Sequence, residues 1–526
     1  MNKVKLSLEN RVDFLFYFNW FLDAEAAPVV IQNIEDKLNA GKKVAVLSCD
    51  GALETCWKNP LGSSKTCARC RFWKRGAIRR FEGRLEHWTV DHALIGKEKI
   101  FQTVLSQVQY DSIDDIKRIY YNGAWYGWGA FSTYVSLARQ SQPQITPEFN
   151  RIFSPLLAQG LRLSIAIEAV LLANDIGEII VFNGRTADTR PVFDIAKAKD
   201  IRVRSLELAR GTNGRFRGQQ RVNSLPQDVV AASKEIDALW RNSAESDSVK
   251  CAVAKSFFEG RRAGKGTADV TSWVTRQSPQ ELPASWTRAR RNIVFYTSSE
   301  FEVAGIKELQ DGAAFESQIQ AIDAIANGVT QTRDAHLTVR VHPNSVSGDN
   351  FLERKLKELA ARHSRVSIEG AGSSVSTYRL MEESDLVVSA NSTMAIEAAY
   401  WGKPAVITGR AFYESLGSTY QIGTEEELTN FIACPPPPLQ KSGCIKYAYW
   451  LMKVDARTER LAFKTRTFNI MSKSVTLYFD AYRLCRSRAL FRVADLLLFR
   501  AEARRNLVGI ASRFQVHLRS KIKLDS

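Results

Sequence analysis

The stretch that decides the fold reads Asp385-Leu386-Val387-Val388-Ser389-Ala390-Asn391-Ser392-Thr393. Its apolar half has the length and composition of a buried strand, and the small polar residues after it are typical of the start of a helix. Similar apolar runs lie at 292–296, 337–341 and 404–408, and helical segments lie between the strands at 315–327, 350–363 and 393–401. Continuous apolar strands that alternate with helices predict a parallel sheet covered on both faces.

A second set of strand and helix signals lies nearer the N-terminus. Apolar runs at 43–48, 178–182 and 201–206 read as strands, and 164–174 has helical periodicity. Between about 260 and 291 the composition turns to Gly, Ser, Pro and Arg, which is typical of a linker. We therefore predict an α/β protein with two parallel-sheet domains, at 1–285 and 286–436, followed by a basic helical extension at 437–526.

Composition and charge limit the class of protein. A chain of 526 residues is too long for a single hydrophobic core. Its composition of 45% hydrophobic and 25% charged residues is ordinary for a soluble protein. No stretch comes near the roughly 18 uninterrupted apolar residues of a membrane span, and the apolar segment 14–22 lacks a signal-peptide cleavage site. These features predict a cytoplasmic protein. No nucleic-acid recognition motif accompanies the net charge of +17, so we expect no nucleic-acid partner.

The positive charge is concentrated at the C-terminus. From Lys441 onward there are nineteen Lys and Arg against six Asp and Glu, and about 493–524 reads as a basic amphipathic helix. Such a helix can lie on an anionic membrane or bind a capsule-assembly complex, which would place the protein peripherally at the inner face of the plasma membrane. A solvated face, or packing against the two domains, stays an open alternative.

Polar residues follow the strands of the second region. In open parallel sheets, ligands bind beyond the carboxyl ends of the strands. The candidate residues lie at these ends, except Glu397, which lies one turn into the helix that follows Ser392. The full set is Ser298, Ser299, Glu300, His342, Pro343, Asn344, Asn391, Ser392, Thr393 and Glu397. A helix start favours an anion, His342 could give a phosphate a hydrogen bond or a positive charge, and Glu397 could hold ribose hydroxyls. Each motif alone is also an ordinary cap or turn, but their joint placement predicts a nucleotide site.

The order of these motifs resembles a known family. The series comprises 340–344, 376–381, 384–393, 397–398, 402–406 and 409–413. It is similar to the donor domain of capsule polysaccharide biosynthesis proteins, the family that includes bacterial Kdo transferases of capsule export. The His-Pro and Ser-Thr elements also resemble those of bacterial GT-B sialyltransferases, whose donors are CMP-sugars. The resemblance covers about residues 290–425 and implies a GT-B fold of two facing αβ domains, with His342 and Ser392-Thr393 on the donor phosphate.

The first region offers candidates for the acceptor side. Asn183-Gly184-Arg185, with Glu207 after the next strand, looks like the Asn-Gly-Arg element of some surface-polysaccharide transferases. A plain Asn-Gly turn beside a surface arginine is the alternative. A transferase needs a carboxylate as base or nucleophile, and Asp50, Asp188, Glu207 and Glu300 all lie near strand ends. We take Glu300 as the first candidate because it belongs to the domain with the stronger motifs.

Four cysteines cluster early in the chain, at Cys49, Cys56, Cys67 and Cys70. Disulfides are disfavoured in the cytoplasm, which leaves a structural zinc site or four reduced thiols. The last two cysteines have Cys-x-x-Cys spacing, whereas the first two are not spaced like a zinc knuckle. Any such metal would be structural. The donor domain carries no Asp-x-Asp motif at a strand end, so we expect a metal-independent reaction that needs no cofactor.

The predicted function is transfer of a sugar from a CMP- or UDP-sugar to a bacterial surface polysaccharide or glycolipid. Two other enzyme classes stay open, a sugar-nucleotide epimerase and a glycerophosphotransferase of the teichoic-acid type. The non-enzyme alternative is a basic scaffold that binds membrane or nucleic acid through its tail. The donor sugar and the stereochemistry of the new linkage are not determined by the sequence.

Overall fold

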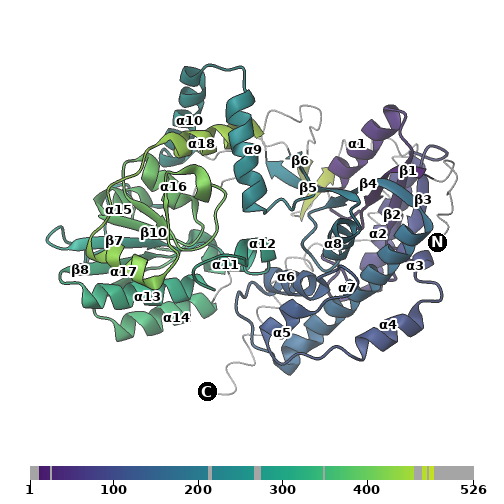
Figure 1. The fold of residues 1–526 in the computed structure, drawn as a ribbon, viewed down its shortest axis with the longest axis horizontal. Helices are drawn as coiled ribbons and strands as arrows, with labels where there is room; N and C mark the ends of the chain where they lie inside the picture. The colour runs from purple at the N-terminus through teal and green to yellow at the C-terminus, as the bar shows by residue number, and fades with distance from the viewer. Residues whose placement is uncertain are drawn as a thin grey trace, which may run out of the picture.

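The structure is a computed structural model that describes residues 11–23, 26–210, 216–265, 274–347, 350–454, 465–470 and 473–478. It contains two six-stranded sheets, each in its own α/β domain, and the two domains lie side by side (Figure 1). The predicted fold class of two parallel-sheet αβ domains is therefore confirmed.

The first sheet has the strand order β3-β2-β1-β4-β5-β6. All its neighbours pair in parallel except β5 and β6, which are antiparallel. Its strands are β1 (Arg11–Tyr17), β2 (Val44–Ser48), β3 (Glu86–Thr89), β4 (Asp175–Phe182), β5 (Arg202–Arg210) and β6 (Phe216–Val222). This is the 3-2-1-4-5-6 order of a doubly wound nucleotide-binding fold. The predicted strands of this region correspond to β2, β4 and β5, whereas the central strand β1 was not predicted.

The second sheet has the order β12-β11-β10-β7-β8-β9 and is parallel throughout. Counted from β7, this is again the 3-2-1-4-5-6 order. Its strands are β7 (Arg291–Tyr296), β8 (Ala335–Arg340), β9 (Val366–Glu369), β10 (Leu386–Ser389), β11 (Ala405–Ile407) and β12 (Tyr420–Gln421). The accompanying helices are α11 (Glu300–Val303), α12 (Lys307–Gln310), α13 (Gln318–Gln331), α14 (Asn350–Arg362), α15 (Thr377–Glu383), α16 (Thr393–Tyr400) and α17 (Glu425–Ala433). The four strands predicted for this domain are confirmed.

The helices of the first domain include one unusually apolar element. They are α1 (Ala26–Asn39), α2 (Ser64–Arg79), α3 (Val90–Ala93), α4 (Glu98–Leu105), α5 (Ile113–Arg118), α6 (Tyr126–Ala138), α7 (Pro147–Ala173) and α8 (Arg190–Ala198). By length and composition alone, α7 could cross a membrane, although Arg162 and Glu168 interrupt its apolar sequence. Its most apolar window is 61% buried, because it packs on the sheet through Leu163 and Ile167 and on an aromatic cluster through Phe149 and Phe153.

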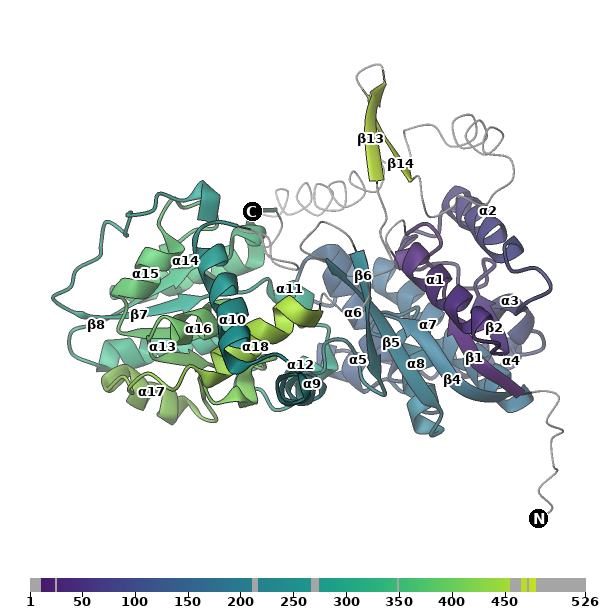
Figure 2. The same ribbon diagram turned by 90° about the horizontal axis from the view of Figure 1, so that it is seen from above.

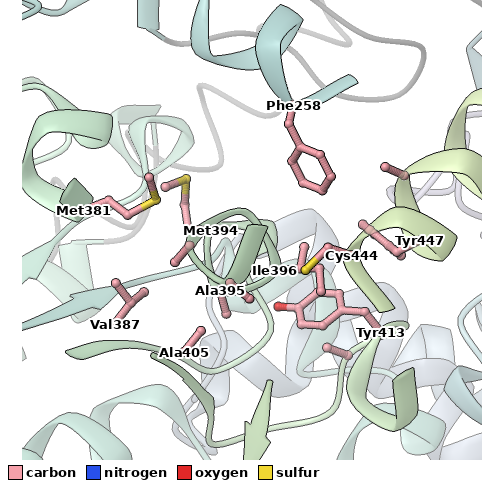
Figure 3. Close-up of a cluster of buried hydrophobic side chains, with 14 of the residues drawn as sticks. Phe258, Met381, Val387, Met394, Ala395, Ile396, Ala405, Tyr413, Cys444 and Tyr447 are labelled. Atoms are coloured by element: carbon pink, nitrogen blue, oxygen red, sulfur yellow. The ribbon is translucent and has the colours of Figure 1, made fainter. Parts of the chain in front are cut away.

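Two helices that precede the second sheet in sequence belong to its core. These helices, α9 (Val229–Asn242) and α10 (Asp247–Arg262), lie beside α18 (Ser442–Val454) (Figure 1). Phe257 and Phe258 of α10 share a buried cluster with Met394 and Tyr447 (Figure 3). The predicted boundary at 285/286 thus marks the start of the second sheet, whereas the packing unit of that sheet also includes α9 and α10.

The described residues of the C-terminal extension form a helix and a hairpin. Helix α18 fits the prediction, but β13 (Thr465–Ile470) and β14 (Lys473–Tyr478) form an antiparallel hairpin (Figure 2). The alternation of Thr, Phe, Val and Tyr in these segments favours a strand over a helix. The amphipathic helix predicted at about 493–524 lies outside the described residues.

Candidate functional site

A pocket of about 650 Å³ lies at the carboxyl ends of β7, β8 and β10. It is the place where a doubly wound sheet binds its ligand. Four residues singled out from the sequence line it, His342, Pro343, Ser392 and Thr393. The other lining residues are Arg261, Val274, Gln277, Tyr296, Thr297, Arg340, Val341, Thr377, Tyr378 and Met394.

His342 is held in one tautomer by its own loop. Its backbone N–H donates to Thr297 Oγ1 at 2.8 Å, and its Nδ1 accepts from the backbone N–H of Asn344 at 3.1 Å. Because Nδ1 is an acceptor, the neutral ring carries its proton on Nε2. Burial, together with the charges of Arg261 and Arg340, lowers the pKa of His342 to about 4. At neutral pH, His342 is therefore a neutral hydrogen-bond donor and not a cation.

The positive charge of the pocket comes from two arginines. Arg340 ends β8, and its Nη1 and Nη2 donate to the carbonyl oxygens of Gly370 at 2.5 Å and Ser373 at 3.0 Å. Within the described residues its buried Nε has no hydrogen-bond partner. Arg261 reaches the pocket from the end of α10. The sequence analysis did not single out Arg261, because it lies in the segment that reads as a linker.

Glu397 lies behind the pocket and holds Arg261. Its Oε1 accepts from Arg261 Nε at 2.8 Å and from Thr393 Oγ1 at 3.1 Å, and its Oε2 accepts from the Tyr378 hydroxyl. The residue is fully buried and does not line the pocket. Both oxygens are thus engaged by protein groups, so this geometry contradicts the predicted ribose contact. Its role in the structure is to orient and neutralise Arg261.

The start of α16 combines a cap with a place at the pocket wall. The Ser392 side chain accepts from the backbone N–H of Met394 at 3.3 Å, as an ordinary N-cap does. Ser392 and Thr393 also line the pocket, whereas Asn391 lies just before them and does not. The cap is therefore observed, while the contact of Ser392 and Thr393 with a phosphate stays a prediction. The positive end of the helix dipole points toward the pocket.

Glu300 has a structural role at another helix. Its Oε1 accepts from the backbone N–H of Gln318, the first residue of α13, at 2.8 Å, and only 8% of the residue is exposed. Ser298 belongs to the same junction, since its N–H donates to Gln318 Oε1 at 3.0 Å. Glu300 does not line the pocket. The structure therefore favours a helix-capping role over the predicted catalytic one.

Glu302, two residues later, does not line the pocket either, but it contacts the loop that carries His342. Asn344 Nδ2 donates to Glu302 Oε1 at 3.1 Å and to Ser299 Oγ at 3.2 Å, so the loop of His342 is tied to both. Partial burial raises the pKa of Glu302, while the charges of Arg139 and Arg185 act in the opposite direction. Because these arginines belong to the first domain, Glu302 lies at the junction between the domains.

The Asn-Gly-Arg element lies on the first-domain side of this junction. Asn183 (φ 64°) and Gly184 (φ 85°) turn the chain through left-handed conformations, and Asn183 Nδ2 donates to Glu207 Oε2 at 2.5 Å. Arg185 Nη1 donates to the hydroxyls of Ser132 at 2.8 Å and Ser136 at 3.1 Å. Burial raises the pKa of Glu207, and the charge of Arg185 lowers it. Sequence-distant groups thus meet here, and Arg185 is not the plain surface arginine of the alternative.

Two other acids near strand ends have structural partners. Asp188 is fully buried and accepts from Asn19 Nδ2 at 3.0 Å, Trp20 Nε1 at 2.6 Å and the hydroxyl of Thr186 at 2.7 Å. Asp50 forms an ion pair with the buried Lys74. Neither lines the pocket of the second domain.

The four early cysteines share one hollow of the first domain. Cys49, Cys56, Cys67 and Cys70 all line a pocket of about 460 Å³, and all four are free thiols. Burial raises the pKa of Cys49 to about 11 and that of Cys70 to about 12. Among the described residues, no three His, Cys, Asp or Glu side chains already form a group that could hold one metal ion.

Strand order and site define the class of this protein, which is a pair of doubly wound domains with a pocket lined by two arginines in the second. Residues 287–439 match the family model described as capsule polysaccharide biosynthesis protein. This part of the chain is therefore similar to that family, and the resemblance predicted from the motif series is confirmed. A comparison with curated proteins finds no match.

Several solved structures are similar at low identity. The KpsC β-Kdo 2,7-transferase of Thermosulfurimonas dismutans is 13% identical, with 63% of this chain and 89% of that chain covered and a TM-score of 0.32. The β-Kdo 2,4-transferase of the same KpsC is also 13% identical. The match covers 60% of this chain and 92% of that chain, with a TM-score of 0.34. The UDP-GlcNAc 2-epimerase of Neisseria meningitidis is 12% identical, with 85% of this chain and 97% of that chain covered and a TM-score of 0.26. The fold assignment rests on the strand order of this chain itself.

Proposed function

We propose that this protein is a glycosyltransferase that moves a sugar from a CMP- or UDP-sugar to a capsule polysaccharide or glycolipid acceptor. The observation that carries the proposal is the pocket at the ends of β7, β8 and β10, which gathers Arg261, Arg340 and His342 at a helix start. The match of this domain to the capsule polysaccharide biosynthesis family supports it.

The pocket suits the phosphate of a nucleotide sugar. Two guanidinium groups supply positive charge, and charge-assisted hydrogen bonds to phosphate are stronger than neutral ones. The Nε2–H of His342 and the start of α16 add donors. As the sugar leaves, negative charge grows on the phosphate, and these groups would stabilise it without a metal ion. We therefore propose a metal-independent reaction, which EDTA should leave unchanged.

Glu302 is the carboxylate that we assign as general base in place of Glu300. A base on the acceptor hydroxyl works best when its pKa lies near the operating pH, and burial raises the pKa of Glu302 in that direction. Asn344 orients its Oε1, and the same asparagine fixes the His342 ring, so the two groups share one support. Arg185 and Glu207 would then meet the acceptor from the first domain.

Nucleotide binding tests this proposal directly. The full-length protein is heated with CMP, UDP, their sugar nucleotides or CDP-glycerol, and the unfolding temperature is recorded. We expect a CMP- or UDP-sugar to raise it, His342→Ala to abolish the increase, and His342→Gln, which keeps an N–H donor, to retain part of it. Ser345→Ala is the matched control, because Ser345 lies on the same loop outside the pocket lining.

The competing functions give different results with the same compounds, when their conversion is followed beside the unfolding temperature. Conversion of one sugar nucleotide into another without an acceptor would identify an epimerase, and stabilisation by CDP-glycerol alone would identify a glycerophosphotransferase. A protein that no nucleotide stabilises would favour the scaffold function. Each of these three outcomes contradicts the proposed transfer.

Membrane association is a separate part of the proposal and rests on the charge of the tail alone. Surface attraction contributes about 1 kcal/mol for each Lys or Arg near anionic lipid. We expect the full chain to float with anionic liposomes at low salt and a chain lacking 490–526 to stay behind. Equal flotation of both proteins would contradict a membrane role for the tail.

A further inference from the structure

A second concentration of positive charge lies in the first domain. The chain carries a net charge of +17, and the residues from Lys441 onward, with nineteen Lys and Arg against six Asp and Glu, contribute +13 of it. This leaves +4 for residues 1–440, yet residues 58–84 alone hold nine Lys and Arg against one acid, Glu82. The rest of the first 440 residues is therefore net acidic, and the cations of 58–84 stand out from it.

Most of these cations belong to helix α2, which contains no Asp or Glu. The helix packs on the core of the first domain through Cys70, Trp73 and Ala77. Residues spaced three or four apart lie on one side of a helix, and the outward side of α2 carries such a series. This basic stripe consists of Lys65, Arg69, Phe72, Arg75 and Arg79. From its first to its last residue the stripe is about 21 Å long.

Three cations of the basic stripe face solvent. Lys65, Arg75 and Arg79 are exposed, and none of them has an acidic partner within the described residues. In contrast, Lys74 on the inner side of the helix is buried and paired with Asp50. Arg75 and Arg79 are one helical turn apart, and like charges at this spacing destabilise a helix. A bound anion would relieve this repulsion, so the stripe is suited to a partner with negative charge.

The basic stripe lies beside the carboxyl ends of the first sheet. Cys67 and Arg71 of α2 line the hollow of about 460 Å³ together with Asn19, two residues after β1, and Cys49, directly after β2. Arg71 Nη1 donates to the carbonyl oxygen of Asp50 at 3.0 Å, which holds its guanidinium at this wall. A doubly wound sheet binds ligands at these strand ends, and Figure 2 shows α2 at the outer edge of the first domain. The stripe therefore extends outward from the ligand-binding edge of the sheet.

We propose that the basic stripe of α2 binds a polysaccharide with repeated acidic groups, and that this polysaccharide is the acceptor chain of the proposed transfer. Binding is a property of α2 alone, whereas the assignment of the bound chain as the acceptor rests on the proposed function. Repeated anionic groups match a row of cations, and Phe72 can cover the apolar face of a sugar ring between them.

A polysaccharide fits the stripe better than a membrane or a nucleic acid does. A helix that lies on lipid places large apolar residues among the acyl chains. All sixteen residues of α2 are described, and its large apolar residues Trp73 and Ile78 pack on the core, which leaves Phe72 on the outward side. No nucleic-acid recognition motif accompanies the stripe in the sequence.

Binding to polygalacturonate, which carries one carboxylate on each sugar, tests the proposal. The full-length protein is titrated with this polymer at low salt, and neutral dextran serves as the control ligand. We expect binding to polygalacturonate and none to dextran. Added salt should weaken the binding, because it screens exposed charges.

A charge variant locates this binding on α2. Lys65→Gln/Arg75→Gln/Arg79→Gln should bind polygalacturonate about tenfold more weakly, because each exposed charge contributes a modest share and three are removed. The matched control removes the same charge from exposed positions on other elements and should bind like the wild type. This control is Arg151→Gln/Lys199→Gln/Lys234→Gln.

Arginine modification separates the stripe from the basic tail, whose charge can also attract a polyanion. The full-length protein is treated with phenylglyoxal, and the modified residues are identified by mass spectrometry. Bound polygalacturonate should slow the modification of Arg75 and Arg79. Arg151, which is exposed on α7, should react at the same rate with and without the polymer.

The proposal fails if the wild type does not bind polygalacturonate, if the stripe variant binds as tightly as the wild type, or if bound polymer leaves Arg75 and Arg79 unprotected. Stripe-dependent binding that is tighter to phosphatidylglycerol vesicles or to DNA would also contradict it. Failure of the proposed function gives a different result. A wild type that binds through the stripe but transfers no sugar keeps the polysaccharide site and loses the transfer. Where transfer occurs, the stripe variant should raise the KM for an acidic acceptor and leave kcat unchanged.

Discussion

The two sheets share one strand order but differ at the carboxyl ends of their equivalent strands. In the second domain, the ends of β7, β8 and β10 surround a pocket with two arginines and His342. In the first domain, the space beyond β1 and β4 is filled by Asp188 and its donors Asn19 and Trp20, and β2 runs into the cysteine pocket. The same scaffold thus holds an open cationic site in one half and a buried polar junction in the other. This difference favours the second sheet as the place for the proposed nucleotide.

Replacement of Arg261 should have the largest effect on this contrast, because it removes both a pocket charge and the partner of a buried acid. Arg261→Ala leaves the fully buried Glu397 uncompensated, which costs about 3–5 kcal/mol of unfolding free energy. Urea denaturation measures the loss, and nucleotide-sugar binding should disappear as well. The neighbouring Arg262→Ala is the control, because that side chain is 43% exposed and its ion pair contributes about 1 kcal/mol or less.

A double variant separates the two roles of Arg261. Arg261→Met/Glu397→Leu replaces the buried pair by apolar groups, which should recover much of the stability but not the donor binding. If Arg261→Ala is as stable as the wild type, the buried pair is not a structural element of this pocket.

Glu302 and Glu300 offer the next comparison, because they are two residues apart with different environments. We expect Glu302→Gln to lower the transfer rate by roughly 10²–10⁴-fold with little change in stability, since it removes the proposed base. Glu300→Gln should cost about 0.5–2 kcal/mol through the cap of α13 and leave the rate of the folded protein nearly unchanged. Steady-state kinetics with urea denaturation distinguish the two, and the reverse pattern would restore Glu300 as the catalytic candidate.

In the first domain, replacement of Arg185 should weaken the binding of the acceptor alone. Its guanidinium is held by Ser132 and Ser136 and lies in a different domain from the nucleotide pocket. Arg185→Ala should raise the KM for the acceptor about tenfold, which corresponds to about 1.4 kcal/mol, while the donor affinity stays the same. Arg202→Ala is the control. Arg202 starts β5, at the edge of the sheet opposite to the Arg185 loop, and its side chain is 55% exposed. A selective loss of donor affinity in Arg185→Ala would contradict the prediction, because it would show that this loop binds the donor and not the acceptor.

The smallest effect concerns acid stability, which should depend on buried histidines of the second domain. Burial lowers the pKa of His342 and of His336 from 6.5 to about 4. Between these values the unfolded chain binds more protons than the folded one, so the unfolding free energy should fall as the pH falls from about 6.5 to 4. Urea midpoints across this range should show the decrease, and His336→Gln or His342→Gln should reduce its slope. An unchanged slope in both variants would mean that neither histidine is neutral in the folded protein.

Much of the second domain follows from sequence because its signals are local. The strands at 292–296, 337–341 and 385–389 are apolar runs of the right length, and the positions of His342, Ser392 and Thr393 follow from where those runs end. The first domain was harder to predict. Strand β1 has an aromatic run that looks like an isolated apolar segment, and only pairing with β2 and β4 identifies it as central.

The sequence by itself determined the alternation of strands and helices, the family resemblance and the loop that carries His342, because residue type and spacing encode them directly. The tertiary structure alone decided which charged residues serve the site. Arg261 meets Glu397 across 136 residues of chain, and that contact exists only because α10 packs on the second sheet. Glu300 and Glu302 differ in role for the same reason. A carboxylate takes its function from the groups around it, and those groups are assembled only when the chain folds.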